Sequence, residues 1–481
     1  MTSGNPFILF AFLVYLAGML AIGLFFFRRT VNLPDYILGG RRLNSWVTAM
    51  SAQASDMSGW LLLGLPGYAY LVGLESVWIA LGLAVGTYLN WRFVARPLRM
   101  KTEEANNSIT IPDYLENRFG DSTRSLRIVS ALFILVFFLI YTASGFVAGA
   151  KLFSTVFGLS YMTGLMIGMT VIISYTFLGG FMAVSWTDFF QALIMIVAII
   201  IVPVLGIIKA GGIITAWETI SSINTELTDA FTAVDGSSLP LISVVSLCAW
   251  GLGYFGQPHI LARFMAIRTT AHIPRARKIA MIWVIFSLTF AVLVGMVGRI
   301  LLGDSLVQGT SETVFMVMVE SLVPSLLAGF LLAAILAAIM STADSQLLVT
   351  SSAITEDFYR VFLRRKAGDR ELVWVGRGTV IAVAIAACIL AYNPESSVLK
   401  LVAYAWGGFG ATFGPVIILS LYWRGITRLG ALAGLITGGI TVLVWKHLSG
   451  GIFELYEIVP GFVLSFAAIV AISLLETFQE N

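Results

Sequence analysis

Apolar runs of about 20 residues, the length that crosses a bilayer as a helix, alternate with short polar segments along the 481-residue chain. Backbone groups in lipid must be paired within the segment, so such runs predict helices. The runs lie near residues 6–27, 44–64, 67–91, 126–150, 161–182, 185–208, 238–258, 279–302, 321–345, 373–392, 398–421, 428–446 and 457–475. The pattern therefore predicts an all-α polytopic membrane protein with about 13 transmembrane helices.

Composition supports this prediction. Apolar residues make up 58% of the chain and charged residues 11%, whereas soluble chains usually carry about 25% charged residues. The two cysteines, Cys248 and Cys388, lie in apolar runs, so neither a disulfide framework nor a cysteine metal site is expected. No phosphate-binding G-x-x-x-x-G-K-[ST] loop occurs. We expect a single integral membrane unit over residues 1–481, not an enzyme, without an organic cofactor.

Charge placement predicts the orientation. The first run lacks a positive segment before it and ends in Arg28-Arg29, which is typical of a retained helix with an outside N-terminus. With 13 crossings, the outer side carries only five of the 29 Lys and Arg residues: Lys151, Lys209, Arg299, Lys400 and Lys446. The rest fall inside, as the positive-inside rule requires. The C-terminus is then inside, and the net charge of +3 needs no nucleic acid as partner.

Two runs are interrupted by residues that do not suit a continuous membrane helix. The second run contains S-A-Q-A-S-D-M-S-G-W at 51–60, and a carboxylate such as Asp56 costs at least about 2.5 kcal/mol at mid-membrane. Asp56 is either a functional group or the partner of a structural arginine. The seventh run contains W-G-L-G-Y-F-G-Q-P-H at 250–259, in which the glycines and Pro258 predict unwinding. Residues 251–256 match the dinucleotide-binding motif G-x-G-x-x-G, but no strand precedes them, which argues against dinucleotide binding. His259, at the end of the block, is expected to be a structural hydrogen-bonding group.

The positions of the breaks indicate an internal repeat. They fall in runs two and seven, so five helices separate corresponding elements, and paired breaks of this kind are typical of inverted-repeat secondary transporters. The repeats would span 44–208 and 238–421, with an extra N-terminal helix at 6–27 and two C-terminal helices at 428–475. Where a helix unwinds, its backbone carbonyls and N–H groups lose their helical partners. The carbonyls can then bind a small cation, and the N–H groups at the start of a half-helix can bind an anionic group.

The ninth run carries a polar stripe that forms either part of a sodium cage or ordinary packing contacts. Ala338, Ser341 and Ser345 share one helical face, and Thr342 and Asp344 flank it. A further acid, Asp188, lies near the inner end of the sixth run and is either functional or an interfacial group.

Several sequence blocks carry a family resemblance along nearly the whole chain: D-Y-I-L-G-G-R at 35–41, A-S-D-M-S-G-W at 54–60, residues 115–119, the long block 250–264, and residues 351–357. On these blocks the chain resembles the sodium:solute symporter family. The resemblance implies a LeuT-like core of two inverted five-helix repeats in a bacterial cytoplasmic membrane.

The resemblance also implies site residues. Sodium is expected at Ala54, Met57, Ala338, Ser341 and Thr342, with Asp56 nearby. Substrate is expected at Ser58, Gly59, Tyr141, Trp250, Tyr254 and Pro258. The matching positions of Arg41 and Asp188 are associated with coupling. Family members usually have a small residue where this chain has Asp344. The added acid is expected either to create a second ion site with Asp188 and Ser345 or to carry a proton, and both alternatives stay open.

The function that the resemblance implies is sodium-coupled symport of L-proline into the cell by alternating access. The substrate carboxylate is expected at N–H groups near Ser58 and Gly59, and the ammonium at carbonyls of the break at 250–258. Sodium, L-proline and the lipid bilayer are the expected partners, with no obligate protein partner. The alternatives are sodium symport of another small amino acid or carboxylate, an ion channel, which lacks an evident filter ring, and a sensor, for which few residues follow the last run.

Overall fold

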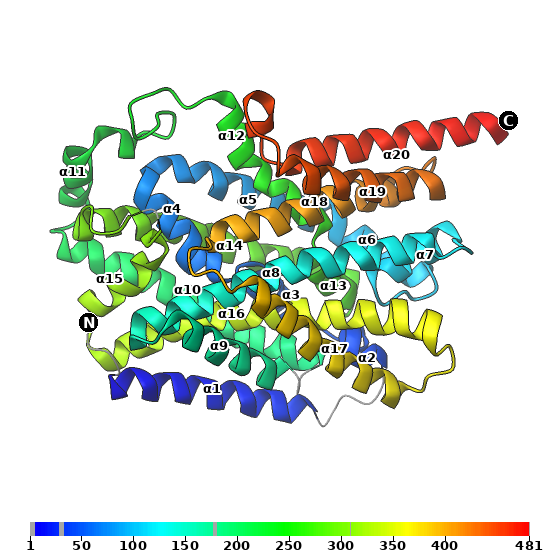
Figure 1. Ribbon diagram of the computed structural model, residues 1–481, viewed down its shortest axis with the longest axis horizontal. Helices are drawn as coiled ribbons and strands as arrows, with labels where there is room; N and C mark the ends of the chain where they lie inside the picture. The colour runs from blue at the N-terminus through cyan, green and yellow to red at the C-terminus, as the bar shows by residue number, and fades with distance from the viewer. Residues whose placement is uncertain (1–4, 28–32, 177–179, 308, 481) are drawn as a thin grey trace.

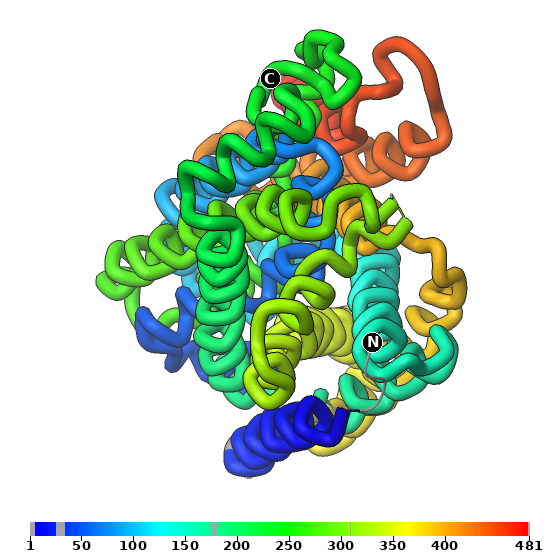
Figure 2. The backbone as a smooth tube through the Cα atoms, turned by 90° about the vertical axis from the view of Figure 1, so that its left-hand side faces the viewer, coloured from blue at the N-terminus to red at the C-terminus, as the bar shows by residue number. Residues whose placement is uncertain are grey.

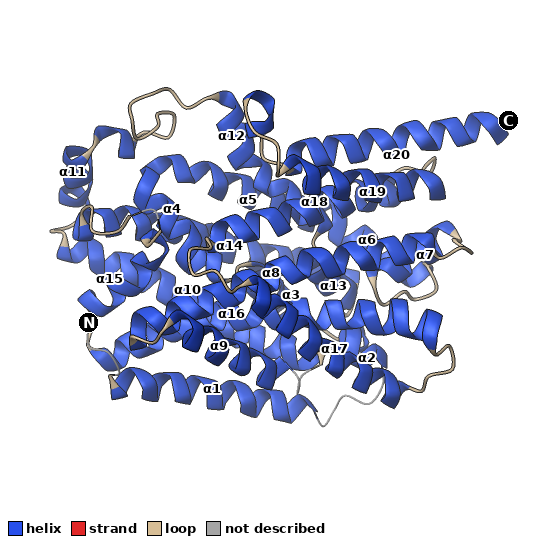
Figure 3. Ribbon diagram, in the orientation of Figure 1, coloured by secondary structure: helices blue, strands red, loops and turns tan. Residues whose placement is uncertain are grey.

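The computed structural model describes residues 5–27, 33–176, 180–307 and 309–480. These residues form helices joined by loops, with isolated β-bridges between Leu43 and Ile267 and between Thr232 and Ser238 and with no strand among them (Figure 3). Ten of the described helices are long and apolar enough to cross a membrane, and two shorter apolar helices accompany them. The predicted all-α polytopic class is confirmed, and the count of 13 crossings stays a prediction.

The α-helices follow one another in the order α1 (Pro6–Phe27), α2 (Leu33–Leu38), α3 (Ser45–Asp56), α4 (Leu65–Val72), α5 (Val77–Leu89), α6 (Ala95–Glu104), α7 (Ile111–Phe119), α8 (Ser125–Phe157), α9 (Tyr161–Thr176), α10 (Phe181–Lys209), α11 (Ile213–Ile223), α12 (Leu241–Cys248), α13 (Pro258–Ala266), α14 (Ile273–Leu302), α15 (Val314–Leu322), α16 (Ser325–Ser352), α17 (Asp369–Leu390), α18 (Val398–Tyr422), α19 (Arg428–Trp445) and α20 (Ile458–Glu480). Short 3₁₀ and π segments join some of them, notably η2 (Trp60–Gly64), η4 (Asn90–Val94), η6 (Ala249–Gly256), η8 (Ser311–Thr313) and η9 (Ala353–Leu363).

The long helices run side by side along the longest axis of the molecule (Figure 1). One end, at the left of Figure 1, carries α11 and α15 and is called the α11 end; the opposite end carries α7 and is called the α7 end. Viewed from the α11 end, α1 lies at the periphery of the bundle (Figure 2). Helix α1 begins at the α11 end, and α20 ends at the α7 end (Figure 1).

The second apolar run folds as a broken helix that is longer than predicted. The side chain of Asn44 caps α3 by accepting from the N–H groups of Trp46 and Val47, both at 3.0 Å. After the break, η2 leads directly into α4, because a proline near the start of a helix removes no needed hydrogen bond. The turn predicted between residues 64 and 67 is therefore wrong. It lies instead at Gly73, whose φ of 64° and contact with the Leu227 backbone suit only glycine.

The seventh run also extends beyond its predicted end at residue 258. Helix α12 passes into the 3₁₀ segment η6, and α13 then continues to Ala266, because Pro258 occupies the first turn of α13. Segment η6 packs backbone to backbone on α5. A Cβ atom at Gly82 would lie 2.2 Å from the Cys248 carbonyl oxygen, and one at Gly86 would lie 2.2 Å from that of Gly251. Glycines thus set the distance between α5 and η6.

At the α11 end, a buried carboxylate joins three elements. Glu312 of η8 accepts from Lys151 Nζ of α8 at 2.6 Å and from Ser397 Oγ at 2.8 Å. It also accepts from the N–H groups of Val398 and Leu399, both at 3.1 Å. The carboxylate therefore satisfies the orphan donors at the start of α18.

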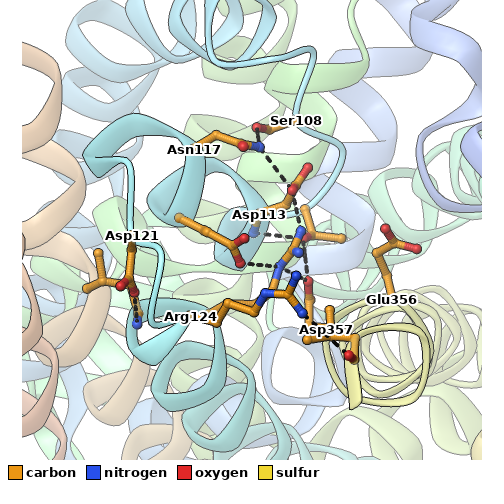
Figure 4. Close-up of polar contacts among 12 residues, drawn as sticks. Ser108, Asp113, Asn117, Asp121, Arg124, Glu356 and Asp357 are labelled. Atoms are coloured by element: carbon orange, nitrogen blue, oxygen red, sulfur yellow. Dashed lines mark hydrogen bonds and ion pairs between the residues drawn. The ribbon is translucent and has the colours of Figure 1, made fainter. Parts of the chain in front are cut away.

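At the α7 end, a second ionic cluster joins α7, α8 and η9 (Figure 4). Arg127 of α8 pairs with Asp113, with Glu116 at 3.2 Å and with Asp357 at 3.0 Å. Asp357 is fully buried and also accepts from Thr110, the N-cap residue of α7, at 3.3 Å. Each end of the bundle is thus closed by buried ionic contacts between elements that are distant in sequence.

Candidate functional site

The break in the second run occurs between Asp56, the last residue of α3, and Trp60. Met57 leaves the helical conformation with φ −88° and ψ 79°. The carbonyl of Asp56 would pair with a later residue in a continuous helix. It accepts instead from Ser58 N at 3.1 Å, Trp60 Nε1 at 3.2 Å and Tyr141 Oη at 3.2 Å. Side chains therefore satisfy the backbone where the helix ends, as buried irregular backbone requires.

The predicted sodium residues lie on the side of α3 that faces α16. Ser341 Oγ donates to the carbonyl oxygen of Ala54 at 2.8 Å and is 3.2 Å from that of Ala338. Thr342 Oγ1 donates to the same Ala54 oxygen at 3.3 Å. Two hydroxyls and two carbonyls thus meet at one point. Met57, at the end of α3, contacts Ser287 of α14 through its sulfur at 3.7 Å.

The second break is also satisfied by side chains. Trp406 of α18 donates through Nε1 to the Trp250 carbonyl at 2.7 Å, and Asn90 donates through Nδ2 to the Tyr254 carbonyl at 3.0 Å. Gln257 Nε2 lies 3.2 Å from the Gly253 carbonyl. Three carbonyls of η6, those of Trp250, Gly253 and Tyr254, therefore already accept hydrogen bonds from protein side chains.

Five aromatic side chains surround the junction of the two breaks: Trp60, Tyr141, Trp250, Tyr254 and Trp406. The rings of Trp60 and Trp250 lie 6.2 Å apart, and Tyr254 packs edge-on against Trp406 at 5.0 Å. Tyr254 Oη donates to Asp56 Oδ2 at 2.6 Å, so the two breaks are joined by a side-chain hydrogen bond. Tyr141 is 1% exposed and Trp250 5%, which means that the junction is closed to solvent. The structure brings Tyr141, Trp250 and Tyr254 together, and their contact with substrate stays a prediction.

The other three predicted substrate residues lie within the first break or directly after the second. Ser58 and Gly59 lie within the break, and a Cβ at Gly59 would come within 2.9 Å of Ala148 on α8. Pro258 instead lines a separate cavity of about 20 Å³ with Ile109 and Val349. Pro258 therefore shapes the start of α13, and its contact with substrate stays a prediction.

An ion pair that was not predicted lies between α3, α10, α13 and α16. Arg263 and Asp188 are both fully buried, and Arg263 Nη2 is 3.1 Å from Asp188 Oδ2. The same carboxylate oxygen accepts from Ser51 Oγ at 2.7 Å. Arg263 also donates to Ser345 Oγ at 2.5 Å, to the His259 carbonyl at 2.9 Å and to Ser51 Oγ at 3.1 Å. Asp188 is thus a buried, paired acid and not an interfacial one.

Sequence reasoning missed Arg263 because it was counted among the inner-loop cations. The signal was present: the residue lies within the unbroken block 250–264, among apolar neighbours. An arginine inside a membrane segment is expected to have an acidic partner. Asp344 lies beside this ion pair, since Ser345 Oγ is 3.3 Å from Asp344 Oδ1. Asp188, Asp344 and Ser345 therefore lie in one cluster around Arg263, and a role in ion binding or coupling stays a prediction.

Arg41 lies apart from these three residues. Its guanidinium donates to the carbonyls of Met265 at 2.7 Å and Ser108 at 2.9 Å, and to Asn107 Oδ1 at 3.0 Å. Burial, with a smaller effect from the nearby Arg99, lowers the pKa of Arg41 to about 10. Arg41 therefore joins the end of α13 to the segment before α7.

His259 was expected to form hydrogen bonds. It is fully buried, and neither ring nitrogen has a hydrogen-bond partner in the described part of the chain. Its ring contacts Phe138 at 5.6 Å and Tyr141 at 6.2 Å between centroids. The expectation is wrong for the side chain, which packs against aromatic rings of α8. The backbone carbonyl of His259 does accept a hydrogen bond, from Arg263 at 2.9 Å.

A helical membrane bundle in which two broken helices meet at buried oxygen and aromatic groups defines a secondary transporter. The family model for the sodium:solute symporter family matches residues 36–438. The sodium/proline symporter of Escherichia coli strain K12 is 52% identical over 472 residues, covering 97% of this chain and 93% of that protein. The high-affinity proline transporter PutP of Bacillus subtilis strain 168 is 50% identical and covers 95% of this chain and 96% of its own length. The chain belongs to the sodium:solute symporter family.

Solved structures support the same fold. A sodium-coupled sialic acid symporter in a substrate-bound outward-open state superposes with a TM-score of 0.81 at 20% identity, covering 98% of both chains. A nucleobase-cation-symport-1 family transporter in a closed conformation gives a TM-score of 0.56 at 13% identity and covers 92% of this chain and 96% of its own. The LeuT-like fold is thus confirmed.

Proposed function

We propose that this protein couples the inward movement of sodium to the uptake of L-proline. One observation carries the sodium part: two hydroxyls of α16 meet the Ala54 carbonyl at the end of α3. Carbonyl and hydroxyl oxygens are the ligands that hard cations prefer. A sodium ion bound there would fix the broken helix α3 against α16, and so fix one wall of the aromatic junction.

Proline as substrate is supported by the relatives and by the chemistry of the junction. Relatives that are about half identical along nearly their whole length are named as proline transporters. The rings of Tyr141, Trp60 and Trp250 offer apolar surface for a small hydrocarbon ring.

The sodium gradient supplies enough free energy with one ion. A charge that moves through 100 mV releases about 2.3 kcal/mol, and a tenfold concentration ratio adds about 1.4 kcal/mol. Their sum, about 3.7 kcal/mol, supports several-hundredfold accumulation of substrate.

We further propose the arrangement that the sequence predicted: inverted repeats over 44–208 and 238–421, with helices 6–27 and 428–475 added outside the core. The α7 end would face the cytoplasm of a bacterial cell and the α11 end the outside. The N-terminus is then outside and the C-terminus inside. Single cysteines at Thr225 and Arg365, labelled from one side of intact cells, test this orientation.

Uptake of labelled proline into proteoliposomes tests the function, with a sodium gradient, a proton gradient or neither. Uptake should require sodium and should be lost in the variant Ser341→Ala/Thr342→Ala, which removes both hydroxyls. Uptake that ignores sodium, or that survives this double substitution unchanged, would contradict the proposal. Competition by other amino acids and by carboxylates decides the alternative substrates.

The number of ions per proline depends on the acids near α16. Asp344 and Asp188 lie on either side of Ser345 and Arg263, so a second cation there would have two carboxylates as ligands. Measuring charge per proline in wild type and in Asp344→Ser tests this arrangement. A lower ratio in the variant supports the second ion, and an unchanged ratio excludes a role for Asp344 in it.

A further inference from the structure

A polar cavity of about 450 Å³ lies at the α7 end, between α7, the start of α8 and η9. A water molecule occupies about 30 Å³, so the cavity has room for a phosphate group. Its charged lining consists of four arginines and three acids: Arg124, Arg127, Arg360, Arg365, Asp113, Glu116 and Glu356. Because arginine is well suited to bind phosphate, the partners of each arginine decide what the cavity can bind.

Two of the four arginines are already paired with acids. Arg127 forms ion pairs with three carboxylates, those of Asp113, Glu116 and Asp357. Arg360 Nη1 is 3.1 Å from both carboxylate oxygens of Glu356. The acids that line the cavity therefore have these two guanidinium groups as their partners.

The other two arginines, Arg124 and Arg365, converge on one backbone oxygen. Arg124 Nη1 is 3.4 Å and Arg365 Nε is 3.3 Å from the carbonyl oxygen of Val361. In Figure 4 the Arg124 side chain reaches from the start of α8 toward η9. Neither arginine forms an ion pair with a carboxylate within the described ranges of the chain. Two cations that share one neutral acceptor repel each other, so an anion bound between them would be stabilised by both.

Both arginines lie directly outside helices that are long and apolar enough to cross a membrane. Arg124 immediately precedes α8, and Arg365 follows the end of the span Ser325–Leu363. Phe362 and Leu363, next to Arg365 in sequence, are 50% and 72% exposed. Basic groups beside exposed apolar side chains at the end of a span are typical of the phospholipid headgroup layer. A phosphate that binds here is therefore expected to carry acyl chains.

We propose that Arg124 and Arg365 bind the phosphate of an anionic phospholipid, and that the bound lipid holds the end of η9 against α8. A guanidinium can donate two parallel N–H groups to a phosphate, and the two arginines belong to the two elements that the lipid would join. The acyl chains would lie along Phe362 and Leu363. A zwitterionic lipid would bring an ammonium group close to the two guanidinium groups, so the site prefers an anionic headgroup.

Native mass spectrometry of the purified full-length protein tests the binding. The protein is titrated with phosphatidylglycerol or with phosphatidylcholine of the same acyl chains, and the Kd values are compared. Each arginine near an anionic headgroup is worth about 1 kcal/mol, or about fivefold in Kd. Wild type should therefore bind phosphatidylglycerol about 20-fold more tightly than phosphatidylcholine.

Substitutions assign the preference to the two arginines. Arg124→Gln/Arg365→Gln should lower the preference to less than about threefold, and each single variant should lower it about fivefold. The matched control is Arg268→Gln/Lys278→Gln, which removes two exposed cations before and within the start of α14 and should keep the wild-type preference. Arg365 is exposed, so Arg365→Gln decides the matter if the double variant does not fold.

Hydrogen exchange at the end of η9 tests the second part of the proposal and the source of the phosphate. With phosphatidylglycerol at about ten times its Kd, exchange in the segment 357–363 should slow about tenfold in wild type, because the lipid must leave before the segment opens. Exchange should be unchanged by the lipid in Arg124→Gln/Arg365→Gln. Inorganic phosphate at millimolar concentration should neither slow exchange nor displace the lipid.

The proposal is overturned if wild type binds the two lipids equally, or if the control variant loses the preference as the double variant does. Exchange that the anionic lipid leaves unchanged in wild type would refute the link between η9 and α8. Inorganic phosphate that displaces the lipid and slows exchange equally well would show a site for free phosphate and would also overturn the proposal.

Discussion

Arg263 offers the sharpest test of the packing around the site. Arg263→Met removes the guanidinium and keeps a long apolar side chain. Its loss breaks the contacts with Ser51, Ser345 and the His259 carbonyl and leaves Asp188 buried without its cation. Removing one partner of a buried ion pair costs about 3–5 kcal/mol. The free energy of unfolding, measured by SDS titration in mixed micelles, should fall by about that amount.

The double variant separates the charge effect from the loss of packing. Arg263→Met/Asp188→Leu removes both charges, and replacing a whole buried pair by apolar groups is often neutral or stabilising. The double variant should therefore be more stable than either single variant. Arg360→Met is the control, because the Arg360 side chain is 45% exposed in its pair with Glu356 and such a pair contributes at most about 1 kcal/mol. The reasoning is refuted if the two single effects simply add, or if Arg263→Met costs no more than Arg360→Met.

Three further substitutions have definite expected outcomes. Gly253→Ala places a Cβ 1.8 Å from Trp406 Nε1 and should lower stability by about 1–3 kcal/mol, with proline uptake reduced in parallel; uptake at the wild-type rate would contradict this. Arg127→Met leaves Asp357 buried without its cation and should lower the free energy of unfolding by about 3–5 kcal/mol. The segment that carries α7 should then be cleaved faster by protease than in wild type. Glu312→Gln loses the ion pair with its lysine and should cost about 1–3 kcal/mol in the SDS titration, and no change would show that neutral hydrogen bonds suffice there.

Helix bounds were predicted most accurately where the length of an apolar run alone decides them. Helix α1 begins and ends at the predicted residues 6 and 27, because nothing polar interrupts the run. The two breaks were also predicted correctly, since an acid in one run and glycines with a proline in the other do not suit a continuous helix. The turn at Gly73 was missed because the sequence was divided into two apolar runs between residues 64 and 67. Only the contact with Leu227, distant in sequence, shows that Gly73 is the turning point.

Side-chain partners were the least predictable part of the site. Arg263 and Asp188 are separated by 75 residues, and no local pattern pairs them. The hydrogen bond between Asp56 and Tyr254 was likewise not predicted, because 198 residues separate them. The sequence identifies which polar groups lie in the membrane, but which neighbour each one meets depends on how the helices are rotated about their axes.

The glycine contact between α5 and η6 has a consequence for how the protein changes shape. The backbones of Gly82 and Gly86 lie so close to those of Cys248 and Gly251 that no side chain fits between them. Neither segment can slide or tilt without carrying the other, so α5 and η6 are expected to move as one rigid body in the transport cycle. A covalent cross-link between α5 and η6 should then leave turnover intact. A cross-link between η6 and α16, across the junction, should arrest turnover.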